Sequence, residues 1–343
     1  MRQLLNTLFV TSEDIYLSLD GENVVANRDK MIMARYPLHT LSAIISFSYS
    51  GASPALMGAC AQKGISLSFC TPRGKFLARV TGESNGNVLL RRAQYRIAGD
   101  SVQSCIIARN MIFGKIYNAR WSIQRTRRDH SLRVDINRLD EVSNQLKSLL
   151  PQLLCQDNLD SLRGLEGAAA TAYFSVFDQL ILGDKSIFYF KSRTRRSPLD
   201  PVNALLSFAY SLLSHDCASA LESVGLDSYV GFLHRDKPGR SSLALDLMEE
   251  LRPCVADRFV LSCINNRIFH KSDFDYKENG SVFLNENGRR AFLQKWQERK
   301  KDNLTHPFLG EKIPWGLVPY LQATLLARYL RDDLEAYPPF LWK

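Results

Sequence analysis

The spacing of apolar residues changes near residue 82, and this change constrains the fold more than any other feature of the chain. Before it, Ile15, Leu17 and Leu19 alternate with polar neighbours, which is typical of a strand with one buried face. Beyond it, apolar residues recur every three or four positions, as on one face of a helix. The sequence therefore predicts an α+β protein, in which a small N-terminal β-sheet domain is followed by a larger all-α domain.

Within the first part, turn and cap signals divide the chain into short elements. Asp20-Gly21 predicts a tight turn, and Ser53-Pro54 followed by Gly64 predicts a short helix over 54–63. Further strands are expected at 23–26, 31–36, 43–47, 65–69 and 76–80. Because exposed sheet edges pair readily and two-fold dimers are common, this domain is a candidate dimerisation surface.

The polar run at 83–87, which contains Gly86, predicts a linker over 83–90. We therefore expect a β domain over 1–82 and a helical domain over 91–343. In the second part, one predicted helix carries Met111, Ile112, Ile116 and Ile123 at helical spacing. The next carries Val142, Leu146, Leu149, Leu150 and Leu153 in the same way.

Apolar runs and cysteines narrow the class of protein. The longest apolar runs, such as 43–47, are far shorter than the roughly 18 to 20 residues of a membrane-spanning helix. The first ten residues do not read as a signal peptide, so we expect a soluble, cytoplasmic protein without a membrane partner. The seven cysteines occur singly, without a C-x-x-C pair, which argues against a disulfide framework and a structural zinc site.

Positive charge is concentrated in a few segments. The formal net charge is +9, and residues 91–150 hold twelve Lys or Arg against five Asp or Glu. Two further basic clusters lie at 191–196 and 289–301. Clustered positive charge is expected of a protein that binds a nucleic acid, because neutralising phosphates releases counterions. The alternative is that each cluster is a solvated helix face.

Glu166 is the only carboxylate in the alanine-rich run GLEGAAATAYF at 164–174. Alanines favour a helix, and small residues around one charge let another helix or a ligand come close. The alternative is a solvated glutamate that complements the helix dipole. A second segment, RRSPLDPVNALLSFAYSLL at 195–213, places Asp200 as the cap of a helix that begins at Pro201. Asn203 is then either a site residue or a buried amide that ties the loop to the helix.

The third segment, GFLHRDKPGRSSLALDLMEELRP at 231–253, combines an imidazole with two acids. His234 lies in a loop, and Asp246 and Glu249 project from one face of the next helix because they are three residues apart. Oxygen ligands with one imidazole suit Mg²⁺ or Mn²⁺. Such acid pairs are also common on exposed helices, and Glu250 is expected to be solvated.

Taken together, these three segments resemble a known family. The glutamate with its alanine-rich helix, the R-x-P-x-D-P-V-N-A-L-L-S-F-x-Y stretch and G-F-L-H followed by A-L-D-L-M-E-E-L-R-P are similar to the universal CRISPR adaptation integrase, which inserts spacers into CRISPR arrays. The likeness extends over nearly the whole chain. The C-terminal run YPPFLWK resembles the branch that accompanies type I-C systems.

The resemblance implies that Glu166, His234, Asp246 and Glu249 form the catalytic, metal-binding site for Mg²⁺ or Mn²⁺. The last acid is often Asp in the family, so direct or water-mediated binding by Glu249 stays open. Since an imidazole must be neutral to bind a metal, activity should fall at acidic pH.

The resemblance also implies a metal-dependent DNA endonuclease and integrase that joins a 3′-hydroxyl to a phosphodiester. The expected partners are double-stranded DNA, a second copy of the chain and a small ferredoxin-like adaptation protein. The candidate DNA-binding residues are Arg125, Arg127, Arg128, Arg193, Arg195, Arg196 and Asn203. The alternatives are a branched-DNA repair nuclease, a non-catalytic DNA-binding scaffold and a metal hydrolase that acts on small phosphates.

Overall fold

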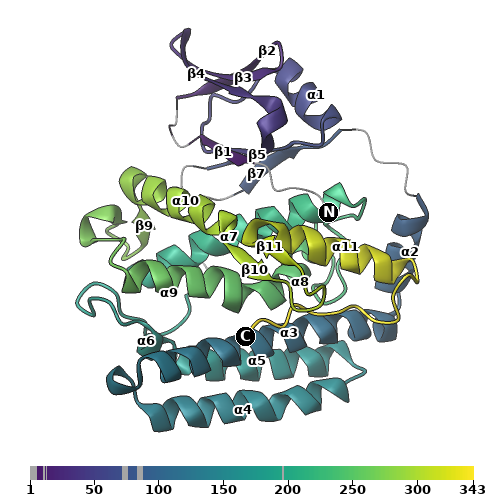
Figure 1. The fold of residues 1–343 in the computed structure, drawn as a ribbon, viewed down its shortest axis with the longest axis vertical. Coiled ribbons are helices and arrows are strands. Elements are labelled where there is room, and N and C mark those ends of the chain that lie inside the picture. The colour runs from purple at the N-terminus through teal and green to yellow at the C-terminus, as the bar shows by residue number, and fades with distance from the viewer. Residues whose placement is uncertain (1–5, 11, 13, 72–75, 83–87, 195–196) are drawn as a thin grey trace.

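A small β-rich part sits on one side of a larger helical part (Figure 1). The computed structural model describes the chain except for residues 1–5, 11, 13, 72–75, 83–87 and 195–196. The predicted α+β organisation, with a β domain before a mostly helical one, is confirmed.

Two sheets and one helix make up the β part. The four-stranded sheet has the order β1-β5-β6-β7, in which β7 alone runs antiparallel to its neighbour, and the three-stranded antiparallel sheet has the order β2-β3-β4. The strands are β1 Asn6–Val10, β2 Tyr16–Asp20, β3 Asn23–Arg28, β4 Met31–Pro37, β5 Leu41–Ser46, β6 Ser66–Cys70 and β7 Phe76–Val80. Helix α1, Pro54–Gln62, begins where Ser53 Oγ accepts a hydrogen bond from Leu56 N. The predicted strands and helix are present, and β1 is an additional strand.

The larger part is built from helices of very different lengths. They are α2 Val88–Ala98, α3 Ser101–Asp129, α4 Ile136–Leu154, α5 Leu159–Ser175, α6 Phe177–Leu180, α7 Pro201–Ser223, α8 Ser242–Leu251, α9 Arg258–Asn265, α10 Glu286–Lys301 and α11 Val318–Leu330. A π-helical segment, η3 Arg252–Asp257, joins α8 to α9. Short 3₁₀ turns are η1 Leu38–Thr40 in the β part and η2 Ser131–Arg133, η4 Lys271–Asp273 and η5 Trp315–Leu317 in the helical part.

The helical part is not purely α. Two antiparallel strand pairs lie in it, β8 Phe274–Tyr276 with β9 Val282–Leu284, and β10 Asn303–Thr305 with β11 Lys312–Pro314. These strands have three residues each, too short for a period-of-two pattern to be recognised in the sequence. The expectation of an all-α second domain is therefore corrected to a mostly helical one.

The boundary between the parts falls close to the predicted linker. Residues 83–87 of that linker lie outside the described residues, and α2 already begins at Val88, so 88–90 are helical. The two parts touch through an ion pair between Arg79 and Glu222 (2.8 Å) and a hydrogen bond between the Ser66 and Ser219 hydroxyls (2.9 Å).

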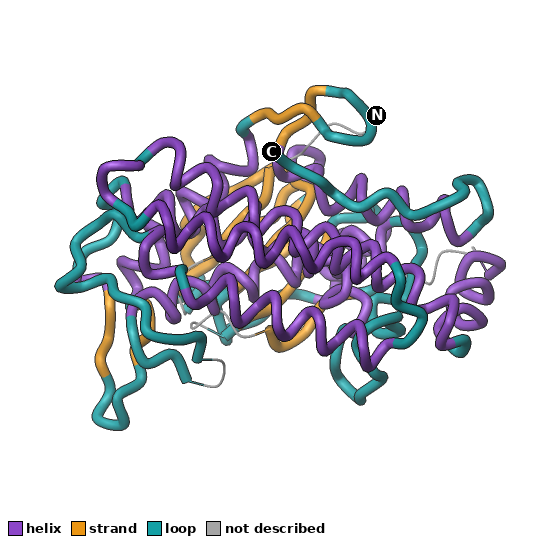
Figure 2. The backbone as a smooth tube through the Cα atoms, turned by 90° about the horizontal axis from the view of Figure 1, so that it is seen from below, coloured by secondary structure: helices purple, strands orange, loops and turns teal. Residues whose placement is uncertain are grey.

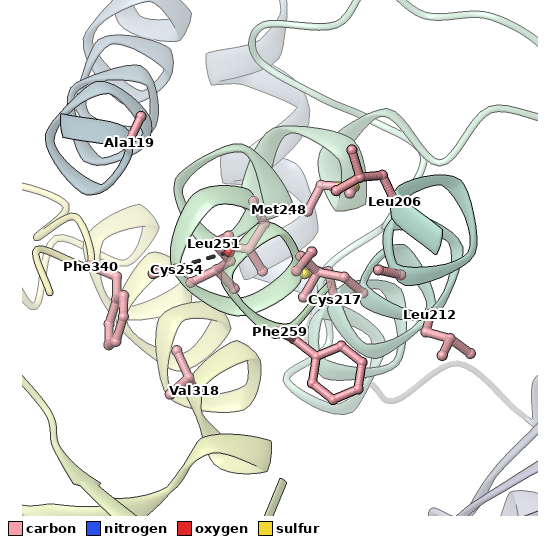
Figure 3. Close-up of a cluster of buried hydrophobic side chains, with 14 of the residues drawn as sticks. Ala119, Leu206, Leu212, Cys217, Met248, Leu251, Cys254, Phe259, Val318 and Phe340 are labelled. Atoms are coloured by element: carbon pink, nitrogen blue, oxygen red, sulfur yellow. Dashed lines mark hydrogen bonds between the residues drawn. The ribbon is translucent and has the colours of Figure 1, made fainter. Parts of the chain in front are cut away.

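Helix α8 lies in the centre of the helical part. Nine of its ten residues are buried. Side chains of α3, α7 and the C-terminal segment, including Ala119, Leu206 and Phe340, surround it (Figure 3). The backbone tube in Figure 2 shows long helices that run side by side through the helical part. Carboxylates on α8 therefore lie inside the protein and need partners there.

Two observations concern the helices and the cysteines of the part of the chain that the structure describes. None of the helices there is long and apolar enough to cross a membrane. Six of the seven cysteines, Cys60, Cys105, Cys155, Cys217, Cys254 and Cys263, are free.

Candidate active site

Three distant segments of the helical part meet at one pocket of about 260 Å³. Glu166 enters it from α5, His234 from the loop before α8, and Glu249 from α8 itself. Lys115 of α3 also lines the pocket. Three of the four residues that the sequence placed in the metal site are therefore close together.

Lys115 connects the two glutamates. Its ammonium forms an ion pair with Glu166 Oε1 and another, at 2.7 Å, with Glu249 Oε2. On its other oxygen, Glu249 meets the Arg252 guanidinium at 3.0 Å. The side chains of Lys115 and Glu249 are only 14% and 5% exposed, so these charges interact with little screening by water.

The cations keep Glu249 ionised despite its burial. Burial by itself raises the pKa of Glu249, but Arg252 and then Lys115 lower it further than burial raises it, to about 2. The pocket therefore contains a permanent negative charge on α8 at any physiological pH.

Asp246 does not line the pocket, because its carboxylate is occupied by the loop that carries His234. Its Oδ2 accepts hydrogen bonds from the backbone N–H groups of Phe232 (2.6 Å) and Leu233 (2.9 Å). Its Oδ1 accepts from the His234 backbone N–H (3.0 Å) and lies 2.6 Å from His234 Nδ1. Asp246 is fully buried, and this placement differs from the expectation that it contacts an ion directly.

The Asp246 contact orients the His234 ring. A carboxylate only accepts hydrogen bonds, so Nδ1 carries the proton and the Nε2 lone pair remains available. Gly231 allows this loop to pass so close, because a Cβ at that position would lie 2.7 Å from Asp246 Oδ2. The arrangement is a histidine held in one tautomer by a buried acid, as is common for metal-binding histidines.

Helix η3 and α7 supply the inner wall of the pocket. Tyr210 donates a hydrogen bond to Asp257 Oδ1 at 2.6 Å, and the guanidinium carbons of Arg193 and Arg252 lie 5.2 and 5.3 Å from the Tyr210 ring centre. Burial raises the pKa of Asp257 to about 6, against the effect of its Tyr210 hydrogen bond. π-Helical segments occur often at functional sites, and this one places Arg252 and Asp257 on the pocket.

Asn203 supports Arg193. Its burial corrects the expectation that its side chain contacts DNA. It is fully buried, and its Oδ1 accepts hydrogen bonds from Arg193 (2.8 Å) and from the Thr194 backbone N–H (3.0 Å). Its Nδ2 donates to Asp200 and to the Ser192 carbonyl. This is the alternative reading of the sequence, a buried amide that ties a loop to a helix.

The other candidate DNA-binding residues are in several environments. Arg193 lines the pocket, whereas Arg125 packs over Trp342. Arg127 and Arg128 form ion pairs with Asp140 (2.6 Å) and Asp129 (2.8 Å). Arg195 and Arg196 lie outside the described residues. DNA binding by these arginines stays a prediction.

Sequence reasoning missed Lys115 and Arg252 and placed Glu250 wrongly. Glu250 is fully buried, not solvated, because Tyr337 and the Phe340 backbone cover it. One signal for Lys115 was available. It interrupts the buried apolar face of α3, one position before Ile116.

Comparison with known proteins identifies the relatives of this chain. The profile of the family "CRISPR associated protein Cas1" matches residues 8–298. The chain is 47% identical over 343 residues to CRISPR-associated endonuclease Cas1 1 of Chlorobaculum tepidum, with both chains covered completely. It is 50% identical over 347 residues, again with full coverage of both, to CRISPR-associated endonuclease Cas1 2 of Rhodospirillum rubrum.

Solved structures share the fold. A casposase bound to integration product has a TM-score of 0.84 at 24% identity, covering 99% of this chain and 95% of that one. The Cas1 protein TM1797 from Thermotoga maritima has a TM-score of 0.80 at 21% identity, covering 96% and 98%. A Cas6-RT-Cas1–Cas2 complex matches with a TM-score of 0.79 at 22% identity, covering 99% of this chain and 36% of that chain.

The fold, a small β domain beside a larger helical domain, places the chain in the structural class that includes these proteins. The profile match and the two full-length relatives show the narrower group. The chain belongs to the Cas1 family of CRISPR-associated proteins and is an endonuclease of that family. The family and the enzyme class expected from the sequence motifs are confirmed.

Proposed function

We propose that this protein inserts short DNA fragments into a CRISPR array, and that a Mg²⁺ or Mn²⁺ ion held by Glu166, His234 and Glu249 assists the reaction. One observation carries the proposal of the site. Carboxylates from α5 and α8 already share a single cation, the Lys115 ammonium, beside the oriented His234 ring.

The donor set fits a divalent ion. Glu249 Oε2 is buried and forms no hydrogen bond of good geometry, although Lys115 Nζ lies 2.7 Å away. Two carboxylates and one imidazole are ligands that Mn²⁺ accepts readily and that Mg²⁺ also uses. No group of three such side chains is preassembled among the described residues, and Lys115 lies between the glutamates. We therefore propose that the ion takes the place of the ammonium.

In the proposed reaction the 3′-hydroxyl oxygen of the incoming fragment attacks a phosphorus of the target strand and loses its proton to water. A new P–O bond forms, the bond from that phosphorus to the target's own 3′-oxygen breaks, and the released 3′-oxygen takes up a proton. Glu166, His234 and Glu249 would hold the divalent ion, which when bound would supply Lewis-acid stabilisation of the charge on the phosphate oxygens. Asp246 holds His234 in one tautomer, and Arg252 holds Glu249 in place. Arg193, at the pocket wall, is positioned to stabilise negative charge on the phosphate.

Joining of a labelled short duplex into a supercoiled plasmid tests the proposal. The wild type should give covalent products with Mn²⁺ or Mg²⁺, whereas Glu166→Gln, His234→Ala and Glu249→Gln should give none and still bind duplex DNA. Cleavage of branched DNA without joining would favour a repair nuclease. Normal joining by all three variants would exclude this site.

Metal binding has its own readout. Adding Mn²⁺ should raise the melting temperature of the wild type, because a ligand of the folded state stabilises it. Glu166→Gln and Glu249→Gln should reduce this shift. If Mn²⁺ raised the melting temperature of both variants as much as that of the wild type, the proposed ligands would be contradicted.

We also propose that the protein forms a dimer through edge strand β4. Met31, Ile32 and Met33 are 64%, 53% and 53% exposed on this strand, and an uncovered apolar edge is a template for pairing with a second copy. Ile32→Glu with Met33→Glu should convert a dimer to a monomer in light scattering. Leu132→Glu, at a fully exposed leucine of the helical part, is the matched control and should leave the mass unchanged. A wild-type monomer would contradict the proposal.

Three finer proposals rest on resemblance. The C-terminal run YPPFLWK supports assignment to a type I-C system, and the shared fold with a chain of a Cas1–Cas2 complex supports a small ferredoxin-like adaptation protein as partner. A chromosomal substrate implies a cytoplasmic location. Co-purification with the adaptation protein of a type I-C system would test the first two, and failure to bind it would contradict them.

A further inference from the structure

The C-terminal segment, residues 337–343, is fixed against α3. Asn118 Nδ2 donates to the Phe340 carbonyl at 2.7 Å, and the Trp342 backbone N–H donates to Asn118 Oδ1 at 2.9 Å. Asn118 is almost fully buried, and Phe340 packs beside α11 and η3 in the core (Figure 3). The position of Trp342 is therefore set by backbone hydrogen bonds to a buried side chain.

Around Trp342 lies a second pocket, of about 620 Å³, which we call the arginine–tryptophan pocket. It is defined by Arg125, Arg258, Arg299, Trp315 and Trp342. The guanidinium carbons of Arg125 and Arg258 lie 4.9 and 4.4 Å from the Trp342 ring centre, and that of Arg299 lies 4.6 Å from the Trp315 ring centre. The two indole rings meet edge to face at 5.0 Å.

The charged side chains that line this pocket are all positive. Lys343 also lines it, and no aspartate or glutamate does. Within the described part of the chain, Arg125 and Arg258 form no ion pair, while Arg299 pairs at 3.2 Å with Asp302, whose side chain is 61% exposed. Cations held close together repel one another, and an anion in the pocket would relieve that repulsion.

We propose that the arginine–tryptophan pocket binds phosphate groups of a DNA backbone, at a site separate from the active site. This inference rests on the proposed function, because it assumes that DNA is the substrate. Guanidinium groups bind phosphate oxygens with two parallel hydrogen bonds. The arginines already pack over Trp342, so the pocket presents charge and not a free ring on which a base could stack.

Helix α3 connects the two sites. Arg125 follows Lys115 by ten residues, a rise of about 15 Å along the helix. Ten residues also make about 2.8 turns, which leaves the two side chains about 80° apart around the helix axis, so they leave α3 in different directions. The pocket therefore contacts DNA away from the reacting phosphate and contributes binding, not chemistry.

The test compares two double variants that remove the same charge. Arg125→Gln with Arg258→Gln changes the pocket. Arg28→Gln with Arg331→Gln is the control, since both arginines lie outside the basic clusters, are 37% and 43% exposed, and pair with Asp14 and Asp333. Fluorescence anisotropy over a range of salt concentrations measures binding of a labelled linear duplex, and competition by a supercoiled plasmid measures binding of closed DNA.

Loss of two phosphate contacts should weaken DNA binding about tenfold and reduce the slope of log affinity against log salt by about two. The control pair should change affinity less than about threefold. Loss for the linear duplex alone would assign the pocket to the incoming fragment, and loss for the plasmid alone would assign it to the target; either supports the proposal. Arg125→Lys with Arg258→Lys should restore part of the affinity.

Two outcomes would overturn the proposal. One is that the pocket and control variants weaken DNA binding equally. The other is that the pocket variant binds DNA like the wild type, even if it loses binding of an acidic polypeptide such as polyglutamate. Circular dichroism melting confirms that each variant is folded. Failure of the proposed function has a different readout. In that case Glu166→Gln and the wild type would not differ in the plasmid-joining assay, whatever the pocket variants do.

Discussion

Neighbouring glutamates on helix α8, Glu249 and Glu250, lie on different sides of the helix and have different partners. Glu249 faces the active-site pocket and contacts the cations of Lys115 and Arg252. Glu250, the next residue, faces the C-terminal segment and accepts hydrogen bonds from Tyr337 OH (2.5 Å), Gln322 Nε2 (2.9 Å) and the Phe340 backbone N–H (2.9 Å). Both side chains are buried, so the difference lies in their partners.

The partners decide which glutamate is charged. Burial raises the pKa of Glu250 to about 7, because neutral donors offset only part of its cost. On the other side, two full positive charges more than offset burial and lower the pKa of Glu249 to about 2. The carboxylate that we propose as a metal ligand, Glu249, is thus kept ionised by cations, whereas Glu250 is held by neutral groups.

Exchanging each glutamate for glutamine gives the largest expected contrast. Glu249→Gln should lower plasmid joining by at least about 100-fold, since even residues that only orient metal ligands cost 10- to 100-fold when lost. Glu250→Gln should stay within about threefold of the wild type. Similar losses in both variants would show that the two sides of α8 do not differ in function.

Asp246→Asn should reduce joining by about 10- to 100-fold. The amide replaces an oxygen acceptor by a donor, so either the His234 ring or the backbone N–H groups of Phe232 and Leu233 lose a partner. DNA binding measured by anisotropy should be unchanged. A variant with full joining activity would contradict the positioning role.

Glu250 should make stability depend on pH. Its pKa is raised on folding, so its contribution is complete below pH 4.5 and is lost as the pH rises through 7, to a limit of about 3 kcal/mol. Glu250→Gln stays neutral, so it should gain stability relative to the wild type between pH 5 and pH 8 in urea unfolding. A constant difference between the two proteins would contradict the raised pKa.

Gly114→Ala should destabilise the protein by about 1 to 3 kcal/mol, because a Cβ there would lie 2.8 Å from Glu250 Cβ and 3.3 Å from Pro339 Cβ. Gly164→Ala is the matched control. It lies on α5 with no atom within 4 Å of the new Cβ, and it should stabilise by about 0.5 to 1 kcal/mol. Equal effects of the two substitutions in urea unfolding would show that α3 and α8 are not tightly apposed.

The sequence predicted the fold well where a pattern repeats over many residues. The helix containing Met111 shows such a pattern, and the structure contains it. The strands at 31–36 and 43–47 were predicted from their β-branched and aromatic residues, and they are present too. Strand pairs β8–β9 and β10–β11 went unseen, since three residues carry no periodicity. Spacing alone also predicted that Glu250 faces solvent. It could not show that a segment almost 90 residues later, with Tyr337 and Phe340, covers this side chain.

The site was predicted mainly through family resemblance. Motifs pointed to Glu166, His234 and Glu249, which meet at one pocket. Asp246 and Glu249 are three residues apart on one helix. Their spacing therefore could not show that Glu249 faces the pocket whereas Asp246 holds the loop that carries His234. Only the path of the backbone at Phe232 and Leu233 distinguishes them.

The contact between Asn118 and Phe340 joins positions 222 residues apart. Contacts at such separation form late, because a long loop must close before they contribute stability. During synthesis the side of α8 that carries Glu250 should therefore stay uncovered until residues 337–340 have emerged. Forms of the protein in which residues 337–343 are missing or not yet synthesised should consequently depend on chaperones and be prone to aggregation.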